Sequence, residues 1–303
     1  MLGILPASMK RLLLSLCLVC LCGFQAFAED AALSAKVVEY RKAAEQGDAK
    51  AQFILGLCFS NGQGVPKDDD EAFKWCRKAA EQGDVNAQFT LGIYYGSGQG
   101  VAKDQSESVL WNRKAAEQGD RLAQLTLGFD YDQGRGVPKD VVEAVKWYRK
   151  AAEQGDSSAQ SQLANHYDSG EGVAKDKVEA VKWHLKAAEQ GDSGSQLMLG
   201  CRYYSGEGVS KDAAEAVKWW RMSAELGNGL AQYYLGNFCY NKGTGVGKDM
   251  VEAYKWLKLA AAAGVVTAEG IRSEMASHLT PEQIAEADRR VQEWKPKKEE
   301  AGH

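Results

Sequence analysis

The stretch Ala43-Ala44-Glu45-Gln46-Gly47-Asp48 recurs four more times in this chain, and each copy starts 36 residues after the previous one. Two degenerate copies follow, at 223–228 and at 261–265, the last displaced by one inserted residue. Self-similarity at such a period is typical of a solenoid, in which each unit buries its apolar face only against its neighbours. The repeat therefore predicts a solenoid, and a binding surface rather than a catalytic centre.

Each unit contains the pattern of two helices joined by a glycine-rich turn. With Ala51 as position 1, six units cover residues 51–267, and residues 29–50 form an N-terminal half-repeat and cap. In the first helix (helix A), small or apolar residues at positions 1, 5 and 9 share one face. Glycine at position 6, as in Gly56, indicates that another helix approaches closely. After a G-x-G turn, an aspartate such as Asp68 is suited to cap the second helix (helix B).

One tryptophan occupies the same position of helix B in every unit. Such residues could line a ligand groove or pack between the helices, and their recurrence in all six units favours packing. We therefore interpret these residues as structural: Trp75, Trp111, Trp147, Trp183, Trp219 and Trp256.

The combined motif resembles a known family. A-x-x-x-L-G-x-x-Y, then G-x-G-V-x-x-D, then A-x-x-W-x-x-x-A-A-x-x-G is similar to the Sel-one-like repeat (SLR), a relative of the tetratricopeptide repeat, over about residues 33–267. The resemblance implies an all-α, right-handed superhelical solenoid of 36-residue helix-turn-helix repeats that serves as an adaptor for proteins. Two departures are Ala164 in place of the helix A glycine, and an extra residue near Tyr240–Gly243.

The first 28 residues lie outside the repeats. Lys10 and Arg11 precede an apolar run over residues 12–24, and Ala26-Phe27-Ala28 follows it. This order is typical of a secretory signal peptide cleaved after Ala28, whereas an uncleaved anchor would need about 20 apolar residues. We expect a periplasmic or secreted protein with no membrane insertion after cleavage, which the family resemblance also implies for a bacterial chain.

The C-terminal end is expected to close the array. Thr280-Pro281-Glu282-Gln283 has the features of a helix start, with Thr280 as N-cap and Gln283 at the capping-box position. We interpret residues 268–294 as terminal capping helices, which a solenoid needs to cover its last apolar face. Capped ends predict a monomer rather than a self-associating module, and residues 295–303 are expected to be a disordered tail.

Charge and motifs narrow the function classes. The chain has 37 basic and 41 acidic side chains, and removal of Lys10 and Arg11 with the signal peptide would change its net charge from −4 to −6. That balance argues against nucleic acid as a partner. The motifs S-x-x-K, G-x-S-x-G, G-x-x-x-x-G-K-[ST] and H-E-x-x-H are absent, so we expect no enzymatic activity and no cofactor. The alternative is β-lactam binding or hydrolysis, because some cysteine-rich relatives have been linked to penicillin binding.

Cysteines and histidines offer two further hypotheses. An oxidising compartment would permit the disulfides Cys58–Cys76 and Cys201–Cys239, with buried free thiols as the alternative. His166 and Asp130 occupy position 8 in consecutive units, so a pair across adjacent helices is conceivable. With no third ligand evident, we predict no metal site and interpret these residues as a polar surface.

Positions 4 and 8 of helix A vary between units and lie one turn apart on one face. Positions that vary are free to serve a ligand, although neutral variation on a solvated face would look the same. In tetratricopeptide-like solenoids helix A lines the concave side, so this stripe is the candidate groove for another protein or peptide. Its candidate residues, with the neighbouring Asn165, are Ile54, Tyr94, Thr126, Asp130, Gln162, Asn165, His166, Met198, Arg202, Tyr234 and Phe238.

Overall fold

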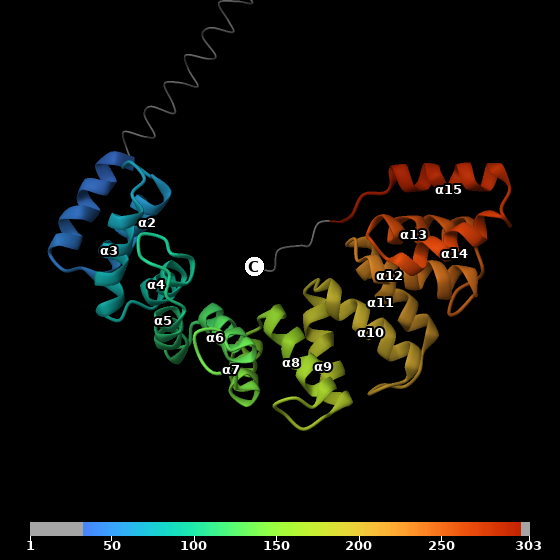
Figure 1. The fold of residues 1–303 in the computed structure, drawn as a ribbon, viewed down its shortest axis with the longest axis horizontal. Helices are drawn as coiled ribbons and strands as arrows, with labels where there is room; N and C mark the ends of the chain where they lie inside the picture. The colour runs from blue at the N-terminus through green and yellow to red at the C-terminus, as the bar shows by residue number, and fades with distance from the viewer. Residues whose placement is uncertain (1–32, 298–303) are drawn as a thin grey trace, which may run out of the picture. The chain divides into compact units, whose positions relative to one another are not determined.

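The computed structural model describes residues 33–297, and within that range it contains helices and turns but no strand (Figure 1). Residues 33–45 are helical and precede the first complete repeat. The helices that follow are α2 (Ala49–Asn61), α3 (Asp69–Glu81), α4 (Val85–Ser97), α5 (Gln105–Glu117), α6 (Arg121–Gln133), α7 (Val141–Glu153), α8 (Ser157–Ser169), α9 (Lys177–Glu189), α10 (Ser193–Ser205), α11 (Ala213–Glu225), α12 (Gly229–Tyr234), the π-helix η1 (Leu235–Asn241), α13 (Met250–Ala262), α14 (Val266–Ala276) and α15 (Pro281–Glu293).

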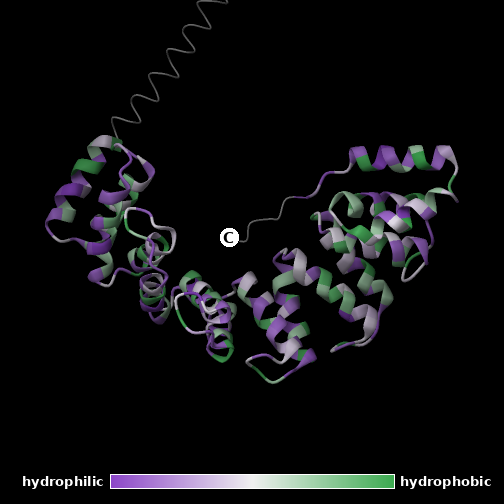
Figure 2. Ribbon diagram, viewed as in Figure 1, coloured by the Kyte–Doolittle hydropathy of each residue, from purple (hydrophilic) through white to green (hydrophobic). Residues whose placement is uncertain are grey.

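These elements confirm an all-helical chain of paired helices with a period of about 36 residues. Helix A of the six units is α2, α4, α6, α8, α10 and α12 with η1, and helix B is α3, α5, α7, α9, α11 and α13. Every helix mixes hydrophobic and hydrophilic residues along its length (Figure 2). On a larger scale the chain divides into two compact parts of several repeats each, which we call unit 1 and unit 2. Unit 1 extends to Asp130 and includes Gly134–Pro138, and unit 2 comprises Tyr131–Gln133 and the chain from Lys139 onward. The six 36-residue units are called repeats from here on.

The predicted helix boundaries are confirmed by their caps. Asp68 accepts a hydrogen bond from the backbone N–H of Glu71 at 3.0 Å and so begins α3. Its equivalents at the other five helices B make the same kind of cap. Asp48 likewise caps α2 through the N–H of Ala51 at 2.7 Å. The recurring aspartates therefore define where both helices of a repeat start.

The second glycine of each G-x-G turn packs against the preceding helix B. Gly100 has φ of +65°, and a Cβ at this position would overlap the carbonyl oxygen of Asp69 at the start of α3. Gly136 stands in the same relation to Gln105, and Gly245 to Ala213. These turns therefore require glycine for both backbone conformation and close approach.

The glycine at position 6 of helix A allows the two helices of a repeat to pack closely, as predicted. A Cβ on Gly56 would lie 2.6 Å from Cys76 Sγ and 3.1 Å from the backbone oxygen of Ala72. A Cβ on Gly236 would likewise lie 3.0 Å from the carbonyl oxygen of Ala253. Helix B backbone thus occupies the space that a side chain would need.

Glutamine side chains link consecutive repeats. Gln52 Nε2 donates to the carbonyl of Ala44 at 2.9 Å, and Gln52 Oε1 accepts from Gln82 Nε2 at 2.7 Å. The Gln88–Gln118 and Gln160–Gln190 pairs repeat the second bond, at 2.7 and 2.9 Å. Each glutamine on helix A is buried, so these bonds satisfy amide groups that would otherwise be costly to bury.

The fifth and sixth repeats lack the donor of this glutamine–glutamine hydrogen bond. Leu226 stands where Gln190 stands one repeat earlier, and Ala263 occupies the equivalent position in the sixth repeat. Gln196 and Gln232 still donate to the preceding helix B, but the buried Oε1 atom of each lacks a hydrogen-bond partner among the described residues.

The extra residue of the sixth repeat is accommodated inside helix A. After Tyr234 the α-helix changes into the π-helix η1, which holds one more residue per turn than the regular helix. The turn that follows keeps its glycine, Gly245, against Ala213. The insertion therefore changes the helix and leaves the contact of the turn in place.

Helices α14 and α15 follow the repeats, and both pack on α13. Thr280 and Gln283 form the predicted capping box of α15. Trp294 contacts Trp256 with ring centroids 6.4 Å apart, and Lys258 pairs with Asp288 at 2.7 Å. α15 thus covers part of the last helix B.

The segment expected to be a free tail is held at its start. The backbone N–H of Lys297 donates to the carbonyl of Glu225 at 2.8 Å, and Lys297 Nζ lies 2.5 Å from the Glu225 carboxylate. Residues 298–303, like the predicted signal peptide at 1–28, lie outside the described residues. Within residues 33–297, no helix is long and apolar enough to span a bilayer.

Candidate functional site

The candidate stripe on helix A separates into two layers. Side chains at position 4 are partly accessible, and so are Arg202 and Phe238 at position 8, whereas Asn165 is exposed. At position 8, however, Tyr94, Asp130 and His166 are only 3%, 1% and 6% exposed. These three side chains lie beneath the accessible residues of the stripe, and they expose too little surface for a partner to contact. The partly accessible position 4 residues are Ile54, Thr90, Thr126, Gln162, Met198 and Tyr234.

In unit 1, the buried position 8 residues contact helix B. The hydroxyl of Tyr94 lies 4.0 Å from Cys76 Sγ. Asp130 pairs with Arg135 at 3.3 Å. Burial raises the pKa of the Asp130 carboxyl, although Arg135 and a hydrogen bond from Asn112 oppose the rise. These interactions belong to the interior of the unit.

In unit 2, His166 is also an interior residue. Its ring lies 5.6 Å from that of Tyr148, and its Nδ1 is 3.1 Å from the carbonyl oxygen of Glu171. The interpretation of His166 and Asp130 as a polar surface is therefore wrong, because both side chains are buried. No group of three or more His, Cys, Asp or Glu side chains suited to a metal occurs within residues 33–297.

The residue after each helix B tryptophan is a second variable position, and it is buried in all six repeats. In unit 1, a Cβ on Gly56 or Gly92 would meet Cys76 or Asn112, and in unit 2 a Cβ on Gly200 would meet Trp220. Sequence variation between repeats therefore does not distinguish a ligand-binding face from a core whose contacts differ from repeat to repeat. The residues at this position are Cys76, Asn112, Tyr148, His184, Trp220 and Leu257.

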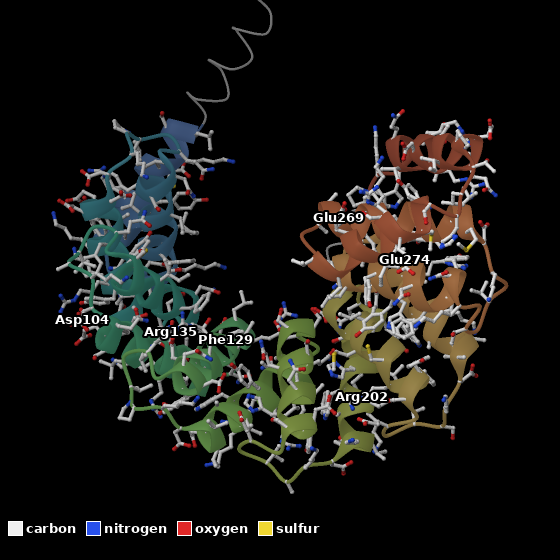
Figure 3. All side chains as sticks on the ribbon, turned by 45° about the vertical axis from the view of Figure 1, so that its right-hand side comes forward. Asp104, Phe129, Arg135, Arg202, Glu269 and Glu274 are labelled. Carbon is white, nitrogen blue, oxygen red and sulfur yellow. The ribbon has the colours of Figure 1, made fainter. Side chains whose placement is uncertain are left out.

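One polar network in unit 2 joins α8, α9 and α10 around the buried His184 and Ser195, and no sequence motif marks it. His184 Nδ1 is 3.1 Å from Ser195 Oγ, and its Nε2 is 3.6 Å from Asp168 Oδ2. Arg202, which projects from α10 (Figure 3), pairs with Asp168 and with Glu207, both at 2.5 Å. Burial alone would raise the pKa of the Asp168 carboxyl, but the neighbouring His184 ring and the positive charge of Arg202 outweigh it and hold the pKa below its ordinary value.

The serine, histidine and aspartate of this network are not arranged as a catalytic triad. In a triad, histidine Nε2 faces the serine and Nδ1 faces the aspartate, whereas here the two nitrogens are exchanged. Ser195 and His184 are 0% and 1% exposed, so a substrate could not reach the hydroxyl. The arrangement orients Arg202 and links three helices.

Beside this network, unit 2 has a surface pocket with a volume of about 340 Å³. Trp220 and Tyr234 stack there with ring centroids 4.9 Å apart and planes 12° apart. Tyr204 lies 5.6 Å from Trp220. We call this pocket the aromatic pocket; it is lined by Met198, Cys201, Arg202, Tyr204, Ser205, Glu207, Trp220 and Tyr234. Three of the predicted groove residues, Met198, Arg202 and Tyr234, thus meet in one place.

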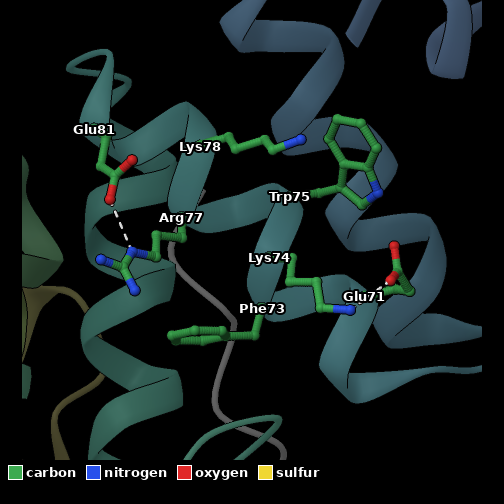
Figure 4. Close-up of a pocket in the computed structure, with 7 residues that line it drawn as sticks. All are labelled: Glu71, Phe73, Lys74, Trp75, Arg77, Lys78 and Glu81. Carbon is green, nitrogen blue, oxygen red and sulfur yellow. Dashed lines mark hydrogen bonds and ion pairs between the residues drawn. The ribbon is translucent and has the colours of Figure 1, made fainter. Parts of the chain in front are cut away.

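A second hollow, of about 420 Å³, lies along α3 in unit 1 (Figure 4). All of its lining residues come from this one helix, and Phe73 and Trp75 project from different sides of it. Lys74 pairs with Glu71 and Arg77 with Glu81 within the helix, each at 2.8 Å, and Lys78 Nζ lies 4.1 Å from the centroid of the Trp75 ring. It is a helix surface with satisfied charges rather than a binding cavity.

The repeated tryptophans are buried or partly buried. Trp111, Trp147, Trp183 and Trp256 are buried, while Trp75 and Trp219 are partly buried. In the first four repeats, a lysine three residues after the tryptophan covers its ring; Lys150 Nζ, for example, lies 3.7 Å from the Trp147 centroid. In the fifth repeat Met222 replaces that lysine.

The four described cysteines are free thiols, so neither candidate disulfide is present. Cys76 points at Gly56 and the Tyr94 hydroxyl, and Cys201 lines the aromatic pocket. Burial raises the pKa of Cys76 and of Cys239 to about 12, which keeps both thiols protonated and poorly reactive.

The paired helices and the 36-residue period define a helical repeat protein. The Sel1 repeat family model matches residues 40–48, 49–84, 85–120, 121–156, 157–192, 193–228 and 229–265. The chain therefore belongs to the Sel1 repeat family, and the family's repeats begin two residues before the positions chosen from the sequence.

Several solved structures are similar to this chain. A Sel1 repeat protein from Oxalobacter formigenes is 35% identical, with a TM-score of 0.61, over 77% of this chain and 96% of its own. The protein c5321, described as a protective antigen of uropathogenic Escherichia coli with an SLR fold, is 31% identical over 86% of this chain and 72% of its own, with a TM-score of 0.39. Helicobacter pylori cysteine rich protein B is 29% identical over 43% of this chain and 93% of its own, with a TM-score of 0.35. No curated protein matches the chain.

Proposed function

We propose that this protein is an exported scaffold that binds an extended segment of another protein along its helix A face and catalyses no reaction. Membership of a helical repeat family supports the scaffold, because such arrays present long surfaces for binding. The pattern of the first 28 residues supports export.

The observation that carries the proposal is the accessible layer of helix A in unit 2. Gln162, Asn165 and Met198 lie along consecutive helices A, and Met198 reaches the aromatic pocket. Helix B presents mainly lysine and glutamate side chains paired with each other, such as Lys146 with Glu143 and Lys182 with Glu179. Exposed pairs of this kind contribute little to recognition.

Site-specific photo-crosslinking tests this proposal. A photoreactive amino acid is placed at residue 162, 165 or 198 on helix A, and at residue 146 or 182 on helix B as controls. Because position 8 is largely buried, residues 94, 130 and 166 are unsuitable sites. We expect a protein partner captured from helix A positions only. Capture from helix B alone, or equally from both helices, would contradict the assignment of the face.

The same preparation tests two further parts of the proposal. Light scattering should give the mass of a monomer, because α14 and α15 cover the last repeat. A chromogenic β-lactam should not be hydrolysed, because Ser195 is enclosed and the described thiols Cys76 and Cys239 are protonated. Turnover of the β-lactam would revive the hydrolase alternative. Protein recovered from a periplasmic extract or the culture medium, with Glu29 as its first residue, would support export.

A further inference from the structure

We propose that the aromatic pocket of unit 2 binds one uncharged aromatic side chain of the partner segment, as the main anchor of the complex. This inference rests on the proposed function and adds the chemistry of the partner residue. The pocket combines rings, sulfur atoms and a guanidinium group on one accessible surface.

The lining groups favour an aromatic guest over an aliphatic one. The partly accessible Tyr204 and Tyr234 present rings that form offset or edge-to-face contacts with another ring, and the buried Trp220 supports Tyr234 by stacking on it. Met198 and Cys201 add sulfur atoms, and thioether sulfur makes favourable contacts with aromatic edges. The volume of about 340 Å³ lies at the lower end of the range for ligand pockets, which suits one large side chain rather than a cofactor.

The charges at the rim favour an uncharged guest. Arg202 is already paired with Asp168 and Glu207, each at 2.5 Å. Glu207 also pairs with Lys177 at 2.7 Å, and this pairing lowers the pKa of its carboxyl. A charged guest would have to separate these pairs. The flat guanidinium of Arg202 can instead lie against an aromatic ring while its N–H groups remain bonded.

The rings are held in place before a guest arrives. Trp220 is buried against Gly200 and stacks on Tyr234, while Phe238 contacts both Tyr204 and Tyr234 with centroids 5.7 Å apart. A pocket whose side chains are already fixed loses less conformational entropy on binding. The wall of the pocket is therefore prepared for a rigid partner.

The π-helix provides a second, independent observation at the same place. Tyr234 is the last residue of α12, and Phe238 lies within η1. The other five helices A of the described chain are regular α-helices without this feature. π-helical turns are rare and are found frequently at functional sites. Here the extra residue sets the position of Phe238 against the two tyrosines of the pocket wall.

A displayed library of random dodecapeptides, selected on the protein purified from cells expressing the full chain, tests the inference. We expect enrichment of peptides that carry Phe, Tyr or Trp with no adjacent charge. Fluorescence anisotropy of a labelled, selected peptide should show at least tenfold weaker binding to Met198→Lys than to the unchanged protein. Met198→Leu, which keeps an apolar wall, should bind within about threefold.

Met222→Lys is the matched control. It makes the same substitution on helix B of the same repeat, where the side chain is 43% exposed and the first four repeats carry lysine. It should leave peptide affinity unchanged, and equal melting temperatures of the two lysine variants would exclude unfolding as the cause of weaker binding.

The outcomes separate the pocket from the proposed function. Selection of peptides without aromatic residues, or binding to Met198→Lys that equals binding to the unchanged protein, overturns the pocket. If those peptides then lose affinity for a Gln162→Lys/Asn165→Lys variant, the helix A face still stands. Failure to select any peptide, with no capture by crosslinkers at 162 and 198, overturns both.

Discussion

Units 1 and 2 are built from one repeat, yet they fill its buried variable positions differently. Between the helices of a repeat, unit 1 places the small side chains of Cys76 and Asn112, and unit 2 places His184 and Trp220. The large residues of unit 2 bring neighbours with them: His184 contacts Asp168, and Trp220 stacks on Tyr234. A repeat can therefore keep its backbone while its interior changes, and in unit 2 that change reaches the surface as a pocket.

The largest expected effect comes from removing the biggest of these interior residues. Trp220→Ala should destabilise the protein by about 3–5 kcal/mol, because it leaves a cavity between α10 and α11. Cys76→Ala, at the equivalent position of unit 1, removes one sulfur atom and should cost about 1 kcal/mol. Urea unfolding of both variants measures the contrast. Equal losses would show that side-chain size at this position does not distinguish the units.

The stabilities that Asp168 and Asp130 confer should respond to pH in opposite directions. The folded-state pKa of Asp168 is lowered, so its stabilising effect is present above the ordinary pKa and disappears as pH falls through the folded value. Asp168→Asn should therefore cost about 2 kcal/mol at pH 7 through lost charge-assisted hydrogen bonds, and much less near pH 3.

Asp130 in unit 1 is the matched case, because its folded-state pKa is raised. The folded state then gains from protonation as pH falls, and above the folded pKa it carries the cost of a buried carboxylate. Asp130→Asn resembles the protonated acid, so it should be neutral or slightly stabilising at pH 7. Thermal melts of both variants across pH 3–7 check the signs, and parallel pH profiles would contradict the assignment.

A smaller loss of stability is expected when the leucine of the fifth repeat is placed at the equivalent position of the fourth repeat. Gln190→Leu introduces the residue found at position 226 and leaves Gln160 Oε1 without its donor at 2.9 Å. The buried, unpaired amide oxygen should cost about 1–2 kcal/mol. Gln46→Leu lies at the same position of the N-terminal half-repeat, where the side chain is exposed, and serves as a control. A cost no greater than that of the control would refute the role of the glutamine pair.

The smallest effect is the reverse change. Leu226→Gln should supply a donor to the unpaired Gln196 Oε1 and raise stability by about 1 kcal/mol. Differential scanning calorimetry would show a modest increase in melting temperature. A decrease would mean that Leu226 contributes more through apolar contacts than the new hydrogen bond returns.

The fold could be predicted from the sequence almost completely, because its determinants are local and recur. Asp68 and its equivalents cap helices, Gly56 and its equivalents allow close packing, and Thr280 begins α15, all as expected. Each of these signals acts within one or two turns of helix, so it can be recognised without knowledge of the distant chain.

The candidate site was harder to predict, because it depends on which way side chains point between helices. Position 8 varies as a ligand face would, yet Tyr94, Asp130 and His166 point inward. The contact of Arg202 with Asp168 joins residues of two different repeats, and no local pattern marks it. Tyr234 and Trp220 come together only through the packing of α11 on α12. Of the residues that line the aromatic pocket, the sequence pattern indicated Met198 and Tyr234 at position 4 and Arg202 at position 8.

The glycine turns have a consequence for how such a chain can change in length. Gly100, Gly136 and Gly245 each rest on the first turn of the preceding helix B, so the path between a helix start and the next turn joins two anchored points. A residue inserted in the turn itself would displace the glycine, whereas one inserted in helix A can be absorbed as a wider turn, as in η1. Length variants of this array should therefore be tolerated in helix A, and each would locally rotate the side chains that face a partner.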